Sequence, residues 1–225
     1  MAAAPPTSAA DPTSAWPRPS GLLLDAMGTL IGLRASVGST YAAAAAAHGI
    51  QASAAAIDAA FPAIYRNAPP LAFPGLNAAE LERAERRWWG DRIDAVLQAC
   101  GAGPAPADLR QQLFERFADP ALWRVYPDVI EPLRRWHRAG LRLAVVSNFD
   151  GRLDGLLRGL GLAELFELVL VSSRVGAAKP SPLPFQQALA RLGLAPSEVW
   201  HVGDSPEDGA GARAAGLPCL LVRRP

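Results

Sequence analysis

Four short segments of this 225-residue chain place polar residues with useful chemistry directly after, or close to, apolar runs. In chain order, these segments are Asp25 with Gly28 and Thr29, Ser147-Asn148, Lys179-Pro180, and Gly203-Asp204-Ser205-Pro206-Glu207-Asp208. An Asp followed by Gly-Thr is equally typical of an ordinary turn, so the first segment alone indicates little. The four segments together indicate a site that handles a phosphate group.

The acids and the lysine of these segments form a set whose charges balance around a metal ion. A carboxylate such as Asp25 can attack phosphorus and form an aspartyl phosphate, but it meets a charged phosphate only if cations lie between them. Asp25, Asp204 and Asp208 supply the hard oxygen ligands that Mg²⁺ prefers. Lys179 neutralises further charge, and Ser147 can hydrogen-bond a phosphoryl oxygen. Three carboxylates, one divalent ion and one ammonium sum to zero before a substrate binds.

Several neighbouring residues have two readings. Thr29 and Asn148 are predicted to contact the phosphate, although Asn148 could equally be structural. Glu207 could replace Asp208 as a metal ligand, with Asp208 preferred. His201 lies inside an apolar run, which favours a hydrogen-bonded core histidine over a catalytic one.

The segments that must position these residues have the lengths of buried strands alternating with helices. Strands are predicted at 21–25, 141–147, 168–172, 199–203 and 218–223, and helices at 128–139, 151–160, 181–192 and 206–215. Asp128 is the predicted N-cap of the first of these helices, with Gly140 and Gly216 after helix ends. This alternation predicts a parallel sheet, whose carboxyl edge is where such sheets bind ligands.

The interval from 34 to 124 has a different pattern. It shows no convincing strand, but helical periodicity predicts helices near 36–48, 53–66, 77–99 and 107–118, with Asn77 as an N-cap. A helical block inserted after the first strand is therefore expected beside the sheet, as a lid.

Bulk composition excludes several classes of protein. Lys and Arg number 22 against 21 Asp and Glu, so no net charge favours nucleic acid or a membrane surface. No segment has the length of apolar sequence that spans a bilayer. The two cysteines are predicted to be free thiols, which fits a cytoplasmic location. Residues 1–19 are predicted to be a disordered tail. A monomer and a homodimer are both open.

Over about residues 21–224, the four segments in this order resemble the haloacid dehalogenase superfamily, whose members are mostly phosphatases. The stretches 140–162 and 34–49, together with Arg87-Trp88-Trp89, most resemble the group named haloacid dehalogenase-like hydrolase domain-containing protein 3. The resemblance implies an α/β fold with a Rossmann-like doubly wound parallel sheet core, residues 20–33 and 125–225. An all-helical cap, residues 34–124, is inserted after strand one.

The resemblance also implies residue roles and a small phosphorylated substrate. Asp25 would be the nucleophile and a metal ligand, Ser147 would hold the phosphoryl group, and Lys179 would orient and neutralise. Asp204 and Asp208 would complete the Mg²⁺ site, with the main-chain carbonyl of residue 27 as a further ligand.

At position 27 the chain departs from the family pattern. The phosphatases carry a second Asp there, which protonates the leaving alcohol and then activates water, whereas this chain has Met27. A general acid or base contributes roughly 10²–10⁴-fold to a rate, so slow turnover is expected. A non-catalytic phosphate- and metal-binding regulatory protein is therefore the alternative. A 2-haloacid dehalogenase is less favoured, because Asp204 and Asp208 indicate a metal site.

Overall fold

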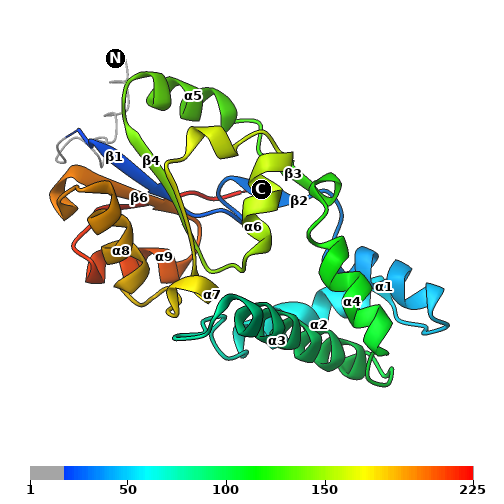
Figure 1. The fold of residues 1–225 in the computed structure, drawn as a ribbon. Coiled ribbons are helices and arrows are strands. Elements are labelled where there is room, and N and C mark those ends of the chain that lie inside the picture. Colours follow the sequence, from blue (N-terminus) through cyan, green and yellow to red (C-terminus); the bar gives the residue numbers. More distant parts are fainter. Residues whose placement is uncertain (1–17, 225) are drawn as a thin grey trace, which may run out of the picture.

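The computed structural model describes residues 18–224, and its central element is a five-stranded parallel sheet (Figure 1). The strands are β1 (Gly21–Leu24), β4 (Arg142–Ser147), β5 (Leu168–Val171), β6 (Val199–Gly203) and β7 (Cys219–Leu221), in the order β5-β4-β1-β6-β7. Strand β1 lies in the centre, with Leu23 opposite Ala144 of β4 and His201 of β6. All five strands were predicted.

Helices cover both faces of the sheet. One face carries α5 (Ile130–Arg138) and α6 (Arg152–Gly159), and the other carries α8 (Leu183–Leu192) and α9 (Pro206–Ala214); the short α7 (Ser172–Val175) follows β5. Successive residues of β1 serve opposite cores, because Leu22 and Leu24 pack with Leu133 of α5, whereas Leu23 packs with Phe185 of α8. The predicted doubly wound sheet is confirmed.

A block of four helices lies beyond the carboxyl edge of the sheet (Figure 1). The helices of this helical block are α1 (Val37–Ala47), α2 (Ala54–Arg66), α3 (Ala78–Ala99) and α4 (Ala107–Arg116). They share a core of their own, in which Tyr41, Ile57, Ile93 and Leu109 are all buried. Helix α3 begins at Asn77, whose side chain accepts from the main chain of Glu80 as predicted.

A short antiparallel strand pair joins the helical block to the sheet. Strand β2 (Ile31–Leu33) pairs with β3 (Trp123–Val125), and Arg34 Nε donates to the Trp123 carbonyl at 2.8 Å. The pair was not predicted, because a three-residue strand shows no readable alternation.

One prediction about a helix end was wrong. Helix α5 has Val129 as its N-cap rather than Asp128, whose carboxylate instead pairs with Arg224 at 2.6 Å. Gly140 and Gly216 do adopt the left-handed conformation after helix ends, as predicted. Of the predicted tail, residues 1–17 lie outside the described residues.

Both cysteines are free thiols, Cys100 and Cys219. Within residues 18–224, no helix combines the length and the apolar character needed to cross a bilayer.

Candidate active site

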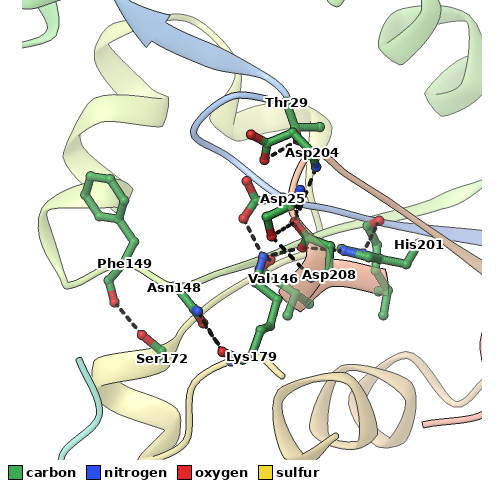
Figure 2. Close-up of polar contacts among 12 residues, drawn as sticks. Asp25, Thr29, Val146, Asn148, Phe149, Ser172, Lys179, His201, Asp204 and Asp208 are labelled. Atoms are coloured by element: carbon green, nitrogen blue, oxygen red, sulfur yellow. Dashed lines mark hydrogen bonds and ion pairs between the residues drawn. The ribbon is translucent and has the colours of Figure 1, made fainter. Parts of the chain in front are cut away.

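The carboxyl ends of three strands bring the predicted residues together (Figure 2). Asp25 directly follows β1, Ser147 ends β4 and Asp204 directly follows β6. Because β1 lies between β4 and β6, Asp25 lies in the middle of this group. The loop between α7 and α8 adds Lys179. Asp25, Ser147 and Lys179 are buried, whereas Asp204 is exposed.

Lys179 is the charge centre of the group. Its Nζ lies 2.6 Å from Asp25 Oδ1 and 2.5 Å from Asp208 Oδ1, and it donates to the Val146 carbonyl at 3.2 Å. Burial by itself lowers the pKa of the ammonium group, but the charges of Asp25 and Asp208 outweigh it and raise the pKa. Lys179 is therefore a cation held against the nucleophile candidate.

Both oxygens of Asp208 are already hydrogen-bonded. Oδ1 accepts from Lys179 and lies 2.8 Å from His201 Nε2, while Oδ2 accepts from the Ser205 hydroxyl at 2.7 Å. Burial raises the pKa of this carboxyl, but the hydrogen bond with His201 and the charge of Lys179 prevail and lower it. Asp208 is thus an ionised anchor for Lys179 and the first turn of α9.

His201 completes this anchor from inside the sheet. It is fully buried, and its Nδ1 lies 3.0 Å from the Leu23 carbonyl. The prediction of a hydrogen-bonded core histidine is confirmed. Its contact with Asp208 was not foreseen, although a strand histidine two residues before Gly203 could have suggested it.

Carboxylate oxygens of Asp25, Asp204 and Asp208 lie within 4.8 Å of one another. Burial, followed by the charges of Asp25 and Asp208, raises the pKa of Asp204 to about 6. Such crowding of negative charge favours a bound cation, and an all-oxygen donor set fits Mg²⁺. Since Asp208 is occupied by hydrogen bonds, Asp25 and Asp204 are the better placed direct ligands. Among the described residues, Glu207 is not part of this cluster.

Two glycines make room for these carboxylates. Gly28 has a φ of +83°, and a Cβ there would lie 2.2 Å from Asp204 Oδ2. A Cβ on Gly203 would lie 2.2 Å from Asp208 Cγ. A side chain at either position would displace a carboxylate of the cluster.

The other predicted residues lie around this cluster. Thr29 is buried and its hydroxyl is 3.5 Å from Asp204 Oδ1, at the limit of a hydrogen bond. Asn148 uses its amide to accept from the Lys179 N–H at 2.8 Å and to donate to the Lys179 carbonyl at 3.0 Å. Asn148 therefore positions Lys179. Met27 is 44% exposed, and its side chain lines the adjoining cavity.

That cavity, of about 730 Å³, runs from the carboxylates to the helical block. Both Trp88 and Trp89 line it. Trp88 Nε1 donates to the Pro69 carbonyl at 2.9 Å, and Trp89 Nε1 donates to Asp150 of the loop after β4 at 2.6 Å.

Glu85 of α3 fixes the helical block to the sheet side of the molecule. Its carboxylate is buried and accepts from the Ser173 hydroxyl at 2.6 Å and from the Gly151 N–H at 3.1 Å. Neither contact was foreseen, because a Glu within a charged helical repeat normally faces solvent.

Comparisons with known proteins find similarity over most of the chain. Residues 19–216 match the family model described as haloacid dehalogenase-like hydrolase. The human "Haloacid dehalogenase-like hydrolase domain-containing protein 3" is 38% identical over 207 residues, which cover 91% of this chain and 82% of that protein. A phosphoserine phosphatase from Thermus thermophilus is 37% identical over 155 residues, covering 67% of this chain and 60% of that protein.

A solved structure supports the same fold. The structure of the protein YfnB from Bacillus subtilis, solved bound to magnesium, superimposes with a TM-score of 0.69 at 20% identity, covering 91% of this chain and 87% of that one.

Proposed function

Because this chain belongs to the haloacid dehalogenase-like hydrolase family, we propose that it is a magnesium-dependent phosphate monoesterase with Asp25 as nucleophile. The observation that carries this proposal is the convergence of Asp25, Asp204 and Lys179 at the carboxyl edge of the sheet. Helices α1–α4 would form the cap over this edge, with core residues 20–33 and 125–225 and cap residues 34–124 as expected from the sequence.

The chain's own residues divide the work of the reaction. Lys179 holds Asp25 Oδ1, which orients the carboxylate for attack on phosphorus. The new oxygen–phosphorus bond forms as the ester bond breaks, and the alcohol oxygen leaves with the bonding electrons. Ser147 and Lys179 would bind the phosphoryl oxygens, and the leaving alcohol oxygen would take its proton from solvent water. A second water would then attack phosphorus and lose its proton to solvent as the bond between phosphorus and the Asp25 oxygen breaks, which frees phosphate and the carboxylate.

The residues present fit a magnesium ion. Asp25 and Asp204 would hold it together with the main-chain carbonyl of Met27, with Asp208 supporting the site from behind. When bound, the ion offsets the negative charge of carboxylate and phosphate. Without it, Asp25 and Asp204 would repel the substrate.

Met27 sets the expected rate. Its side chain lies in the cavity but cannot donate a proton to the leaving alcohol or activate water. The missing proton transfer is worth roughly 10²–10⁴-fold, so turnover should be slow.

Restoring an acid at position 27 tests both the geometry and the proposal. Met27→Asp should raise kcat on an alkyl phosphate by about tenfold or more in the presence of Mg²⁺. Met27→Asn, which has nearly the same size and shape as Asp but cannot transfer a proton in the same way, is the matched control. Equal rates in both variants would contradict the assigned site, as would activity that survives Asp25→Asn.

Met27 also favours a second candidate function, a regulatory protein that binds phosphate and metal without turnover. Counting phosphate released per chain separates the two. More than one phosphate per chain supports the hydrolase, whereas release that stops at one or less supports the binding protein.

A further inference from the structure

The cavity has two chemically different ends. Its core end holds Asp25, Ser147, Lys179 and Asp204, which suit a phosphate. From there it extends into the helical block, and its volume of about 730 Å³ far exceeds that of a phosphate group. Pockets of this size normally enclose most of a ligand as large as a drug molecule. The part beyond the phosphate must therefore accommodate the alcohol portion of the ester.

A cluster of aromatic rings forms the helical side of the cavity. Tyr65 stacks on Phe61 with ring centroids 5.8 Å apart and on Trp89 at 6.1 Å, with interplanar angles of 17° and 27°. Trp88 meets Tyr65 edge-on at 6.0 Å. Tyr65 is 39% exposed, so part of its surface is open beside these rings. We name Phe61, Tyr65, Trp88 and Trp89 the aromatic wall.

The indole N–H groups of this wall are already used. The indole N–H groups of Trp88 and Trp89 donate to Pro69 and Asp150, so both rings offer only apolar surface to a ligand. Two of these rings are also held in place by these bonds. A rigid, apolar ring surface favours a flat or apolar ligand group over a hydrated polar one.

The cations near the wall are poorly placed to bind a charged group of the substrate. The Arg152 guanidinium binds both oxygens of Asp150 and the Phe114 carbonyl, at 2.6–2.9 Å, which uses its charge and its fork of donors. The other lining arginine, Arg66, is exposed at the end of α2. Outside the Asp25–Lys179 site and Arg152, the lining charges are Arg66 and Glu207, which are both exposed. A charged group bound against the rings of the aromatic wall would therefore give up water without meeting a buried, unpaired partner there, which is costly.

Resting on the function proposed above, we propose that the substrates are phosphate monoesters whose alcohol carries an aromatic or similarly bulky apolar group, bound against the aromatic wall. The phosphate lies at Asp25 and Lys179, and the apolar group lies between Tyr65 and the sheet edge. Small, strongly polar phosphate esters would fill only the core end of the cavity and would gain no binding free energy from contact with the aromatic wall.

A matched pair of esters tests this substrate class. Propyl phosphate and 3-phenylpropyl phosphate have the same kind of leaving oxygen, so they differ in the apolar group and hardly in intrinsic reactivity. With Mg²⁺, kcat/KM should be about tenfold or more higher for the phenylpropyl ester. Equal values, or a higher value for propyl phosphate or glycerol 3-phosphate, would overturn the proposal.

Binding of the corresponding phosphonates keeps this test separate from the proposed reaction. 3-Phenylpropylphosphonate should bind the Mg²⁺-loaded wild-type protein about tenfold or more tighter than propylphosphonate in calorimetry. If neither ester is hydrolysed but this difference holds, the hydrolase proposal fails and the ligand class stands. If both esters are hydrolysed and the phosphonates bind equally, the ligand class fails and the hydrolase proposal stands.

Substitution of Tyr65 locates the effect. Tyr65→Ala should bring the ratio of the two kcat/KM values close to one, whereas Tyr65→Phe, which keeps the ring and removes only the hydroxyl, should preserve it. If Tyr65→Ala keeps the wild-type ratio of the two kcat/KM values and the wild-type melting temperature, the apolar group binds elsewhere. That result would overturn the assignment to the aromatic wall.

Discussion

The core end and the helical end of the same cavity are held in shape by different forces. At the core end, Lys179, Asp25 and Asp208 form short charged hydrogen bonds at the ends of buried strands. At the helical end, Tyr65 and Trp89 meet through ring contacts on helices. A charged site tolerates little displacement because its ions are desolvated, whereas packed rings can be exchanged for others of similar volume.

This difference indicates how the two ends divide the function. In the proposed function, the core end carries the chemistry, and its geometry is tied to the sheet. The helical end would select the alcohol portion of a substrate, and it is fixed to the sheet side by a few contacts, of which Glu85 and Trp89 make three. The following variants alter either the core end or the contact that fixes the helical block to the sheet side.

The largest effect is expected from Gly28→Ala at the core end. The new Cβ would lie 2.2 Å from Asp204 Oδ2, so this carboxylate must move away from Asp25. We expect Mg²⁺ affinity, measured by calorimetry, to fall by about 100-fold or more, which corresponds to about 3 kcal/mol.

Gly49→Ala is the matched control for that variant. Gly49 also has a positive φ, +72°, but nothing lies within 4 Å of a Cβ there. Both variants should carry a similar cost of backbone strain, and only Gly28→Ala should lose Mg²⁺. Unchanged Mg²⁺ affinity in Gly28→Ala would contradict the placement of Asp204 in the metal site.

A smaller effect is expected where the helical block meets the sheet side. Glu85→Ala removes the acceptor of two hydrogen bonds and should lower the free energy of unfolding by about 1–3 kcal/mol in urea titrations. Glu85→Gln keeps an acceptor oxygen and should be close to neutral. A loss as large in Gln as in Ala would mean that the charge, rather than the two hydrogen bonds, holds the contact.

The pKa of Glu85 predicts how the difference in stability between wild type and Glu85→Gln depends on pH. Burial, and more weakly the charge of Asp150, raises the pKa of this carboxyl against the lowering effect of its bonds to Ser173 and Gly151. The folded protein therefore holds this proton more tightly than the unfolded chain. The contribution of Glu85 to the free energy of unfolding must therefore fall as pH rises above about 4.5. Because glutamine does not titrate, the stability of Glu85→Gln relative to wild type should increase over that range.

The smallest effect is expected from the titration of Asp204. Its pKa is about 6 in the folded protein against an ordinary value of 3.8, so stability without metal should fall as pH rises from about 4 to 6 and level off above. Because this side chain is exposed, solvent screening reduces the change to the order of 1 kcal/mol. The difference in the free energy of unfolding between wild type and Asp204→Asn, measured over this pH range, isolates the contribution of the Asp204 carboxyl. Saturating Mg²⁺ should abolish this fall, and a fall that persists with Mg²⁺ would contradict the metal site.

The elements that carry both ends of the cavity could be predicted from the sequence. Asp25, Ser147 and Asp204 follow apolar runs that form buried strands, and parallel strands must bring their carboxyl ends to one edge. The helices were equally readable from their periodicity. The element ranges of both regions were therefore predicted to within a few residues.

The features that were missed depend on contacts between distant segments. The β2–β3 pair is too short to show a pattern, and Asp128 pairs with Arg224 rather than capping α5. Asn148 accepts a hydrogen bond from the main chain of Lys179, and neither segment alone predicts this contact. The aromatic wall was missed for the same reason, because rings from α2 and α3 meet only after the helices pack.

The central claim, that a cation at the sheet edge allows the Asp25 carboxylate to meet a phosphate, can be tested directly with acetyl phosphate. Peptide mass spectrometry after a brief incubation should find one phosphoryl group per chain on Asp25 when Mg²⁺ is present, and none with EDTA or in Asp25→Asn. Phosphorylation that is indifferent to Mg²⁺, that falls on another residue, or that is absent even when Mg²⁺ is bound would contradict the account.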